Sequence, residues 1–250
     1  MSTFSVSPKM SNRQFLEDFA KPGCIGLAGG TTLIDKAIRR AERHLDPEHR
    51  WSQWSHAFLF GERRSDGHLW VIESDLLAAR KHLQFGVQEN RVTKYYDETL
   101  YESLAILNLN LPEQETGRLL SAALDLVATR TRYSLTELLG TYVALRHGNL
   151  RQKKNLLSQE RSMYCSAFVQ HIFQQIGIDL APDVHAKTNA PEDLARTPIP
   201  HDAHLLQRDL GESAVREAAS RLRRRARIDV IKAARVMKKK SGIAIRPAQA

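Results

Sequence analysis

Two apolar runs separated by a polar turn restrict the fold more than any other feature of the sequence. The runs are residues 56–60 and 69–74, and the eight residues immediately before Leu69 include Asp66 and Gly67. An Asp-Gly pair between two strand-like runs is typical of a β-hairpin, because these residue types accept the backbone angles of a tight turn. The sequence therefore predicts an antiparallel strand pair in this part of the chain.

A histidine and a glutamate interrupt the two apolar runs. If the turn is centred between residues 64 and 65, Phe60 faces Leu69 and His56 faces Glu73 on one side of the hairpin. A register shift of two residues keeps His56 and Glu73 on that side, whereas a shift of one separates them. A carboxylate beside an imidazole fixes the ring for proton transfer, and the same pair is also explained as a satisfied ion pair at a strand end.

Hydrophobic periodicity predicts further strands and helices around the hairpin. Strands are expected at 24–28, 85–92 and 104–109, helices at 33–43, 112–127, from 134 and at 165–175, and mostly loop at 179–204. In the first helix Leu33, Ile34 and Ala41 share the apolar side. With 250 residues, 42% of them hydrophobic and 26% charged, the chain can bury a large core. We expect an α+β fold with an antiparallel sheet packed against helices.

The net charge of +9 comes entirely from the end of the chain. Residues 211–250 contain 12 Lys or Arg and 3 Asp or Glu, so residues 1–210 are formally neutral. Apolar residues recur at every third or fourth position of this tail, which predicts a basic amphipathic helix. Such a helix suits an anionic membrane surface or an acidic partner, with nucleic acid less favoured, and packing of a solvated helix on the domain is the alternative.

Cys165 lies at the expected start of the helix at 165–175. The backbone N–H groups and the positive dipole end at a helix N-terminus stabilise a thiolate, lower the pKa of the thiol and can bind an oxyanion. These properties suit a nucleophile, for which His56 and Glu73 would supply the base and the group that orients the base. The alternative is a small buried cysteine without a chemical role.

Other candidate sites have weaker support. His171 lies six residues beyond Cys165 and therefore on a different side of the helix. His201 and His204 have no neighbouring cysteine or carboxylate cluster in the sequence to complete a metal site. Residues 26–30 lack a nucleotide-binding signature, and the sequence has no Gly-x-Ser-x-Gly elbow. We therefore expect neither a metal nor a cofactor.

The order of histidine strand, acidic strand and cysteine helix resembles the circularly permuted branch of the NlpC/P60 papain-like superfamily of cysteine hydrolases, which is related to lecithin-retinol-acyltransferase-like proteins. The similar segments are residues 54–60, 70–74 and 164–169, together with 26–40, 133–135 and 191–194. The resemblance spans about residues 20–200. The site residues that it implies are Cys165 as nucleophile, His56 as base, Glu73 as orienting acid, and Tyr133, Tyr164 and Ser166 as pocket candidates.

The resemblance also implies an organisation and an activity. It implies an N-terminal extension at 1–20, a permuted NlpC/P60-like catalytic domain at 21–205 and a basic helical tail at 206–250. The implied activity is hydrolysis of an amide or ester bond in a peptide, cell-wall or lipid substrate. A lipid-directed acyltransferase, phospholipase or thioesterase of the same fold is one alternative. Another is a binding protein without enzymatic activity, whose tail contacts nucleic acid, a membrane or a protein.

The sequence has no signal peptide and no apolar stretch long enough to span a membrane. We therefore expect a cytoplasmic protein. Export by a route that needs no cleavable signal, including delivery as an effector, is the alternative.

Overall fold

The computed structural model describes residues 4–6, 10–75, 78–79, 82–83, 86–131 and 163–207. The chain divides into two units, Met1–Asp209 and Leu210–Ala250, and every described residue belongs to the first. Tyr133, the helix expected from residue 134 and the basic segment 211–250 lie outside the described residues.

A seven-stranded sheet of order β1-β9-β8-β2-β3-β4-β7 forms the centre of the first unit. The strands are β1 (Phe4–Val6), β2 (Ile25–Gly30), β3 (His56–Arg63), β4 (Leu69–Asp75), β7 (Gly86–Arg91), β8 (Tyr101–Asn108) and β9 (Asp202–Gln207). The six strands from β9 to β7 pair antiparallel, and β1 joins β9 in parallel. The short strands β5 (Ala78–Ala79) and β6 (His82–Leu83) pair separately. The expected α+β class with an antiparallel sheet is confirmed.

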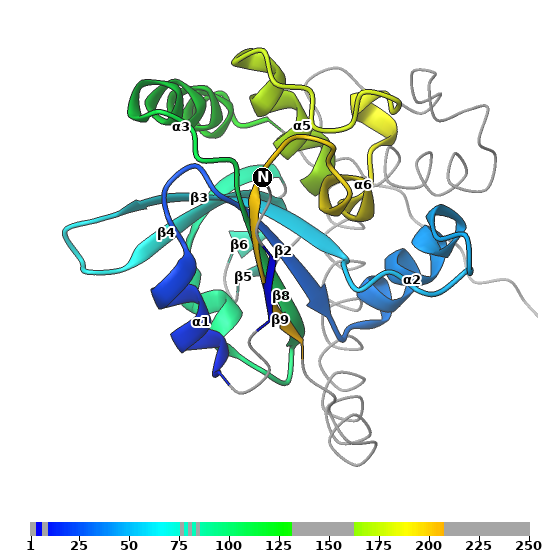
Figure 1. Ribbon diagram of the computed structural model, residues 1–250. Coiled ribbons are helices and arrows are strands. Elements are labelled where there is room, and N and C mark those ends of the chain that lie inside the picture. The colour runs from blue at the N-terminus through cyan, green and yellow to red at the C-terminus, as the bar shows by residue number, and fades with distance from the viewer. Residues whose placement is uncertain are drawn as a thin grey trace, which may run out of the picture. The chain divides into compact units, whose positions relative to one another are not determined.

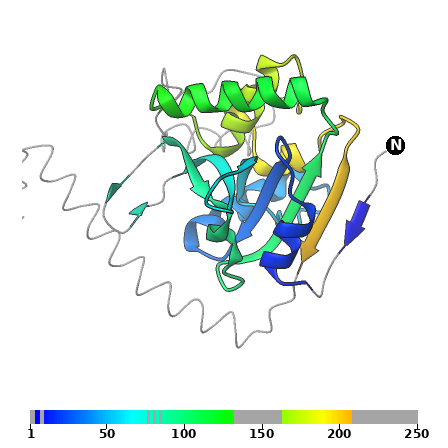
Figure 2. The same ribbon diagram turned by 90° about the vertical axis from the view of Figure 1, so that its left-hand side faces the viewer.

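Helices cover both faces of this sheet. They are α1 (Asn12–Phe19), α2 (Leu33–Glu42), α3 (Glu113–Ala128), α5 (Cys165–Gln175) and α6 (Pro191–Ala195), with the 3₁₀ turns η1 (Arg43–Leu45), η2 (Val92–Tyr96) and η4 (Ala186–Thr188). In Figure 1, α3 and α5 lie over one face and α1 lies on the other, and Figure 2 shows the same layers from the side. Within the described part of the chain, no helix is both long enough and apolar enough to cross a membrane.

The alternation of side chains along the central strands builds two apolar layers. Leu27 and Leu59 pack with residues of α3 and α5 on one face. Phe58 packs on the opposite face with Phe15 and Leu16 of α1. Residues of α1, which the sequence places in an N-terminal extension, are therefore part of the core of this unit.

The hairpin of β3 and β4 has a different register from the expected one. Phe60 pairs with Val71 instead of Leu69, so the register is shifted by two residues. The cause is the turn: the N–H of Gly67 donates to the carbonyl of Arg64, which centres the turn one residue further along the chain. Gly67 has a φ of +77°, a conformation that glycine adopts without strain.

The segment 179–204, expected to be mostly loop, contains α6 and the beginning of β9. Strand β9 lies between β1 and β8, so its pairing partners come from segments that are distant in the sequence. Leu206 is fully buried in the layer under α1, while Leu205 packs on the opposite layer. Ala203 and Leu205 lie on one layer and Leu206 on the other, so the strand has apolar residues on both faces and its sequence shows no apolar–polar alternation that would predict a strand.

Helix α2 is present, but most of its expected apolar side is not buried. Ala41 is 4% exposed, whereas Leu33 and Ile34 are 70% and 57% exposed. Instead, Arg39 turns inward, donates to the carbonyl of Ser52 at 2.9 Å and pairs with Glu102. Because these polar contacts fix the rotation of the helix, its apolar stripe does not determine which side faces the protein.

Candidate functional site

The nucleophile candidate Cys165 is the first residue of α5 and is 4% exposed. The start of the helix is held by side chains on both sides of the cysteine. Tyr164 Oη and Ser166 Oγ donate to the carbonyl of Asn189 at 2.8 and 3.0 Å. Ser74 Oγ at the end of β4 donates to the carbonyl of Met163 at 2.6 Å. Tyr164 and Ser166, expected as pocket residues, are thus buried anchors of the helix that carries the thiol.

His56, the first residue of β3, bridges Cys165 and Glu73. Its Nε2 lies 2.7 Å from Oε2 of Glu73, and its imidazole interacts electrostatically with the side chain of Cys165. Burial lowers the pKa of His56, but its interactions with Cys165 and with the Glu73 carboxylate outweigh burial and raise the pKa to about 10. The imidazole therefore holds a proton at neutral pH and places a positive charge beside Cys165. The two-residue register shift leaves this face of the hairpin intact.

Glu73 is fully buried and accepts four hydrogen bonds. Lys94 Nζ and Asn90 Nδ2 donate to Oε1 at 2.7 and 2.8 Å, while Tyr95 Oη donates to Oε2 at 2.5 Å beside His56. Burial raises the pKa of Glu73, but the attraction of Lys94 and the hydrogen bond and charge of His56 outweigh burial and hold it well below its usual range. The carboxylate is therefore ionised and has one fixed orientation.

Sequence reasoning missed the three other partners of Glu73, which are Asn90, Lys94 and Tyr95. All three follow from the pairing of β4 with β7, in which Glu73 lies opposite Gln88. The only sequence signal for them is the expected strand at 85–92, whose neighbour in the sheet could not be assigned from local pattern.

Within the described part of the chain, His56, Glu73 and Asp75 are a group that could hold a metal ion, with ligand atoms within 4.8 Å of one another. The ammonium group of Lys94, however, lies 2.7 Å from Oε1 of Glu73 and 2.5 Å from Oδ2 of Asp75. The chain's own cation thus stands between the two carboxylates, so the arrangement suits a metal ion poorly.

The remaining histidine candidates have other contacts. His204 Nδ1 hydrogen-bonds to Ser5 Oγ at 2.7 Å, and its ring stacks on Phe19. His201 Nδ1 lies 2.7 Å from the carbonyl of Ile199. These contacts give both residues local structural roles.

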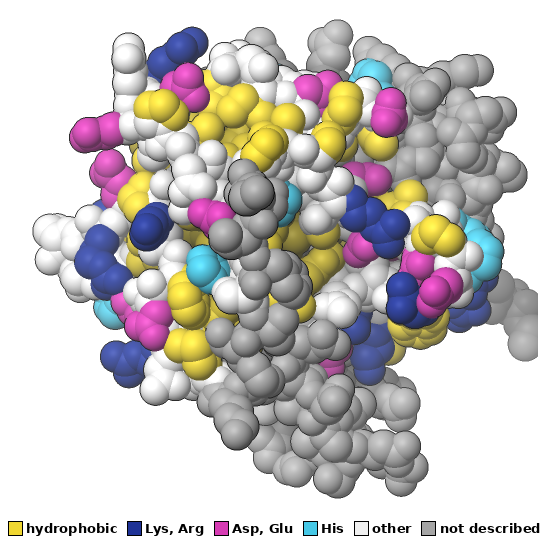
Figure 3. All heavy atoms as spheres, viewed as in Figure 1, with side chains coloured by type: hydrophobic (Ala, Val, Ile, Leu, Met, Phe, Trp, Pro, Cys, Tyr) yellow, Lys and Arg dark blue, Asp and Glu magenta, His cyan; other side chains and the backbone are white. Residues whose placement is uncertain are grey.

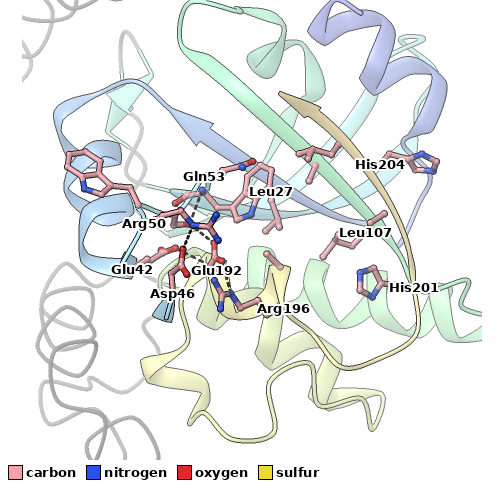
Figure 4. A pocket seen from close by; sticks show the side chains of 17 residues that line it. Leu27, Glu42, Asp46, Arg50, Gln53, Leu107, Glu192, Arg196, His201 and His204 are labelled. Carbon is pink, nitrogen blue, oxygen red and sulfur yellow. Dashed lines mark hydrogen bonds and ion pairs between the residues drawn. The ribbon is translucent and has the colours of Figure 1, made fainter. Parts of the chain in front are cut away.

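A cavity of about 430 Å³ lies between the sheet, the end of α2 and α6. Figure 4 shows Glu42, Asp46 and Arg196 gathered at one end, with Leu107 and His201 at the other. Two ion pairs hold the charged end, Arg50 with Asp46 at 2.9 Å and Arg196 with Glu192 at 2.7 Å.

Elsewhere on the described surface seen in Figure 3, basic and acidic side chains are interspersed, in keeping with the neutral charge of residues 1–210.

Glu42 at the charged end of this cavity is 1% exposed and was not predicted as a site residue. Its Oε2 accepts the N–H of Glu192 at 3.2 Å, while its Oε1 has no hydrogen-bond partner among the described residues. Burial raises the pKa of Glu42 well above its usual range; the Ser52 hydroxyl opposes this, and the negative charges of Glu192, Asp193 and Cys165 act in the same direction as burial. The site therefore favours the protonated form of the Glu42 carboxyl group.

The protonation of Glu42 predicts a specific pH dependence of stability. Because the pKa of Glu42 is higher in the folded than in the unfolded protein, the wild type loses stability as the pH rises above the usual carboxyl pKa. Glu42→Gln has no proton to lose there. We expect its free energy of unfolding, measured with urea, to rise relative to wild type as the pH is raised above the usual carboxyl pKa.

The matched control is Glu48→Gln, since the Glu48 side chain is 71% exposed and forms an ion pair with the equally exposed Arg50. This variant should follow the wild type at every pH. A constant difference between Glu42→Gln and wild type across the pH range would contradict a buried, protonated Glu42.

Comparison of the chain with protein-family models gives no match, and comparison with curated proteins gives none either. The functional conclusion is therefore drawn from the geometry of Cys165, His56 and Glu73.

Proposed function

We propose that the protein is a cysteine hydrolase that cleaves an amide or ester bond through a thioacyl intermediate on Cys165. The observation that carries this proposal is the position of His56, which interacts electrostatically with Cys165 and is hydrogen-bonded to the buried Glu73. The nucleophile, the base and the acid that orients the base therefore lie next to one another in space, in that order.

A permuted NlpC/P60 papain-like fold is part of the proposal. It is supported by the order of the elements, since the histidine strand β3 and the acidic strand β4 precede the cysteine helix α5. It is also supported by packing, because Phe168 and Ile172 of α5 lie against the same sheet that carries His56 and Glu73.

In the first half of the reaction, the thiolate sulfur of Cys165 attacks the substrate carbonyl carbon. A sulfur–carbon bond forms, and the electron pair of the carbonyl double bond moves to its oxygen. The N–H groups of the first turn of α5, which have no partner within the helix, stabilise this oxyanion. As the carbonyl re-forms, the bond to the leaving nitrogen or oxygen breaks, and the His56 imidazolium gives that atom its proton.

In the second half, His56 is neutral and takes a proton from water as the water oxygen attacks the thioester carbon. The sulfur–carbon bond then breaks, the carboxylic acid leaves, and the imidazolium–thiolate pair is restored. Throughout, Glu73 holds the Nε2 side of the ring at 2.7 Å, so that Nδ1 stays directed to the thiol and the reacting groups.

Trapping of the acyl-enzyme tests this function. The protein is incubated separately with peptides, cell-wall fragments and phospholipid vesicles, quenched in acid, and the mass added to Cys165 is measured. A peptidyl adduct assigns an amide substrate, and a fatty-acyl adduct assigns a lipid ester. Cys165→Ala, which keeps the buried Cys24, is the control and should carry no adduct. An unmodified Cys165 with all three substrate classes counts against a hydrolase of this kind.

A further inference from the structure

Lys94 is an almost buried lysine that contacts two acids of the site. It lies in η2, and its side chain is 14% exposed. Its Nζ donates to Oε1 of Glu73 at 2.7 Å and to Oδ2 of Asp75 at 2.5 Å. The ring of Tyr95 lies beside the ammonium group, 5.1 Å from Nζ to the ring centroid. The ordering and desolvation of a lysine are costly, so the two ion pairs need to offset a substantial free energy.

Among the hydrogen-bond donors to Glu73, Lys94 differs from the other three in its charge. Asn90 and Tyr95 are neutral donors. His56 is charged only while it holds the proton of the pair with Cys165, and it gives up that proton during the reaction proposed above. Lys94 therefore supplies the positive charge that remains beside the buried Glu73 carboxylate when His56 becomes neutral.

We propose that Lys94 is a positioning residue, whose ammonium group keeps Glu73 ionised and fixed against His56 and thereby sustains the imidazolium–thiolate pair with Cys165. This inference rests on the proposed function of the site. Without a cation, a carboxylate in this buried position would take up a proton near neutral pH. A protonated Glu73 no longer attracts the imidazolium, so the proton would pass from His56 to the thiolate.

The other charged and titratable groups around Glu73 come from four elements. They are His56 on β3, Asp75 on β4, Tyr95 on η2 and Tyr101 on β8. Burial and the nearby acids raise the pKa of both tyrosines above the usual range, so both stay neutral. Asp75 keeps its contact with Lys94 if Glu73 is neutralised by substitution. The effect that Lys94 exerts on His56 through Glu73 can therefore be separated from the effect of simply removing the charge of Lys94.

The test is a double-variant cycle in the full chain, comparing wild type, Lys94→Met, Glu73→Gln and the double variant. The readout is the rate at which iodoacetamide alkylates Cys165 between about pH 5 and about pH 9, followed by mass spectrometry, because only the thiolate reacts. We expect Lys94→Met to slow alkylation about tenfold near pH 6 and to approach the wild-type rate near pH 9. Lys94→Arg keeps the positive charge and should retain most of the rate.

In the Glu73→Gln background, Lys94→Met should change the rate less than about twofold, because the carboxylate through which Lys94 acts is gone. If Lys94→Met slows alkylation equally in the wild-type and Glu73→Gln backgrounds, the cause is a direct effect of the charge or a general loss of structure, and the proposal is overturned. An unchanged alkylation rate in Lys94→Met would also overturn it. Near-UV circular dichroism checks the fold, and Lys36→Met on α2 is the matched control.

The outcome for Lys94 can be told apart from the outcome for the hydrolase function. Alkylation requires no substrate, so a failure to trap an acyl-enzyme counts against the hydrolase alone. A missing coupling between Lys94 and Glu73 counts against the positioning role alone.

Discussion

Replacing His56 by alanine should slow the alkylation of Cys165 by iodoacetamide about a hundredfold or more near pH 6. In the wild type, the imidazole has a pKa of about 10 and holds the proton, so a positive charge lies beside the sulfur and favours its reactive thiolate form. Without that charge, the N-terminus of α5 alone favours the thiolate, and less of the sulfur reacts near pH 6. The difference should narrow as the pH rises, because the thiol then ionises without the imidazolium. The measurement is the pH dependence of the alkylation rate.

The second cysteine provides an internal reference for this experiment. Cys24 is buried, and burial raises the pKa of its thiol to about 11, so it should stay unlabelled in the folded protein. Mass spectrometry of peptides then assigns the label to Cys165. His201→Ala removes a histidine outside the site and should leave the rate unchanged. If His56→Ala and wild type react equally fast near pH 6, the imidazolium–thiolate pair does not exist in solution.

The three central residues of the candidate site could be found from sequence because their evidence is local. His56 and Glu73 interrupt apolar runs that flank a turn, and any even register shift leaves them on one face. Cys165 begins a helix whose apolar stripe and C-terminal Gly177 are visible in the sequence. The register itself was wrong by two residues, because hydrophobic alternation does not specify which residues form the turn.

The groups that surround Cys165, His56 and Glu73 could not be found in this way. Lys94 meets Glu73 only because β7 pairs with β4 and the chain then turns back through η2. From the sequence alone, Glu42 is expected to be an exposed polar residue at the end of a basic helix. It is buried because α6, about 150 residues later, packs over it. Strand β9 depends in the same way on distant partners. Periodicity records which side of an element is apolar, but it does not record which distant element covers that side.

Glu73→Ala should reduce the free energy of unfolding by about 3 to 5 kcal/mol near neutral pH. The substitution removes the acceptor shared by Asn90, Tyr95 and His56 in a fully buried site, and their polar groups would be left without it. Of its two carboxylate contacts, Lys94 would keep the one with Asp75. Glu73→Gln retains the side-chain volume and one acceptor oxygen, so its loss should be smaller. Urea denaturation followed by circular dichroism measures both.

The pH dependence of this loss distinguishes the ion pair from simple loss of volume. Because the pKa of Glu73 is lower in the folded than in the unfolded protein, its stabilisation is complete above the usual glutamate pKa and decreases as the pH falls below it. The difference between wild type and Glu73→Ala should therefore narrow between about pH 5 and about pH 3. Glu89→Ala on the neighbouring strand removes only a surface ion pair with Arg64 and should cost less than about 1 kcal/mol. A loss for Glu73→Ala as small as that of Glu89→Ala would mean that the buried carboxylate contributes little to the fold, and that its four hydrogen bonds serve the orientation of His56 alone.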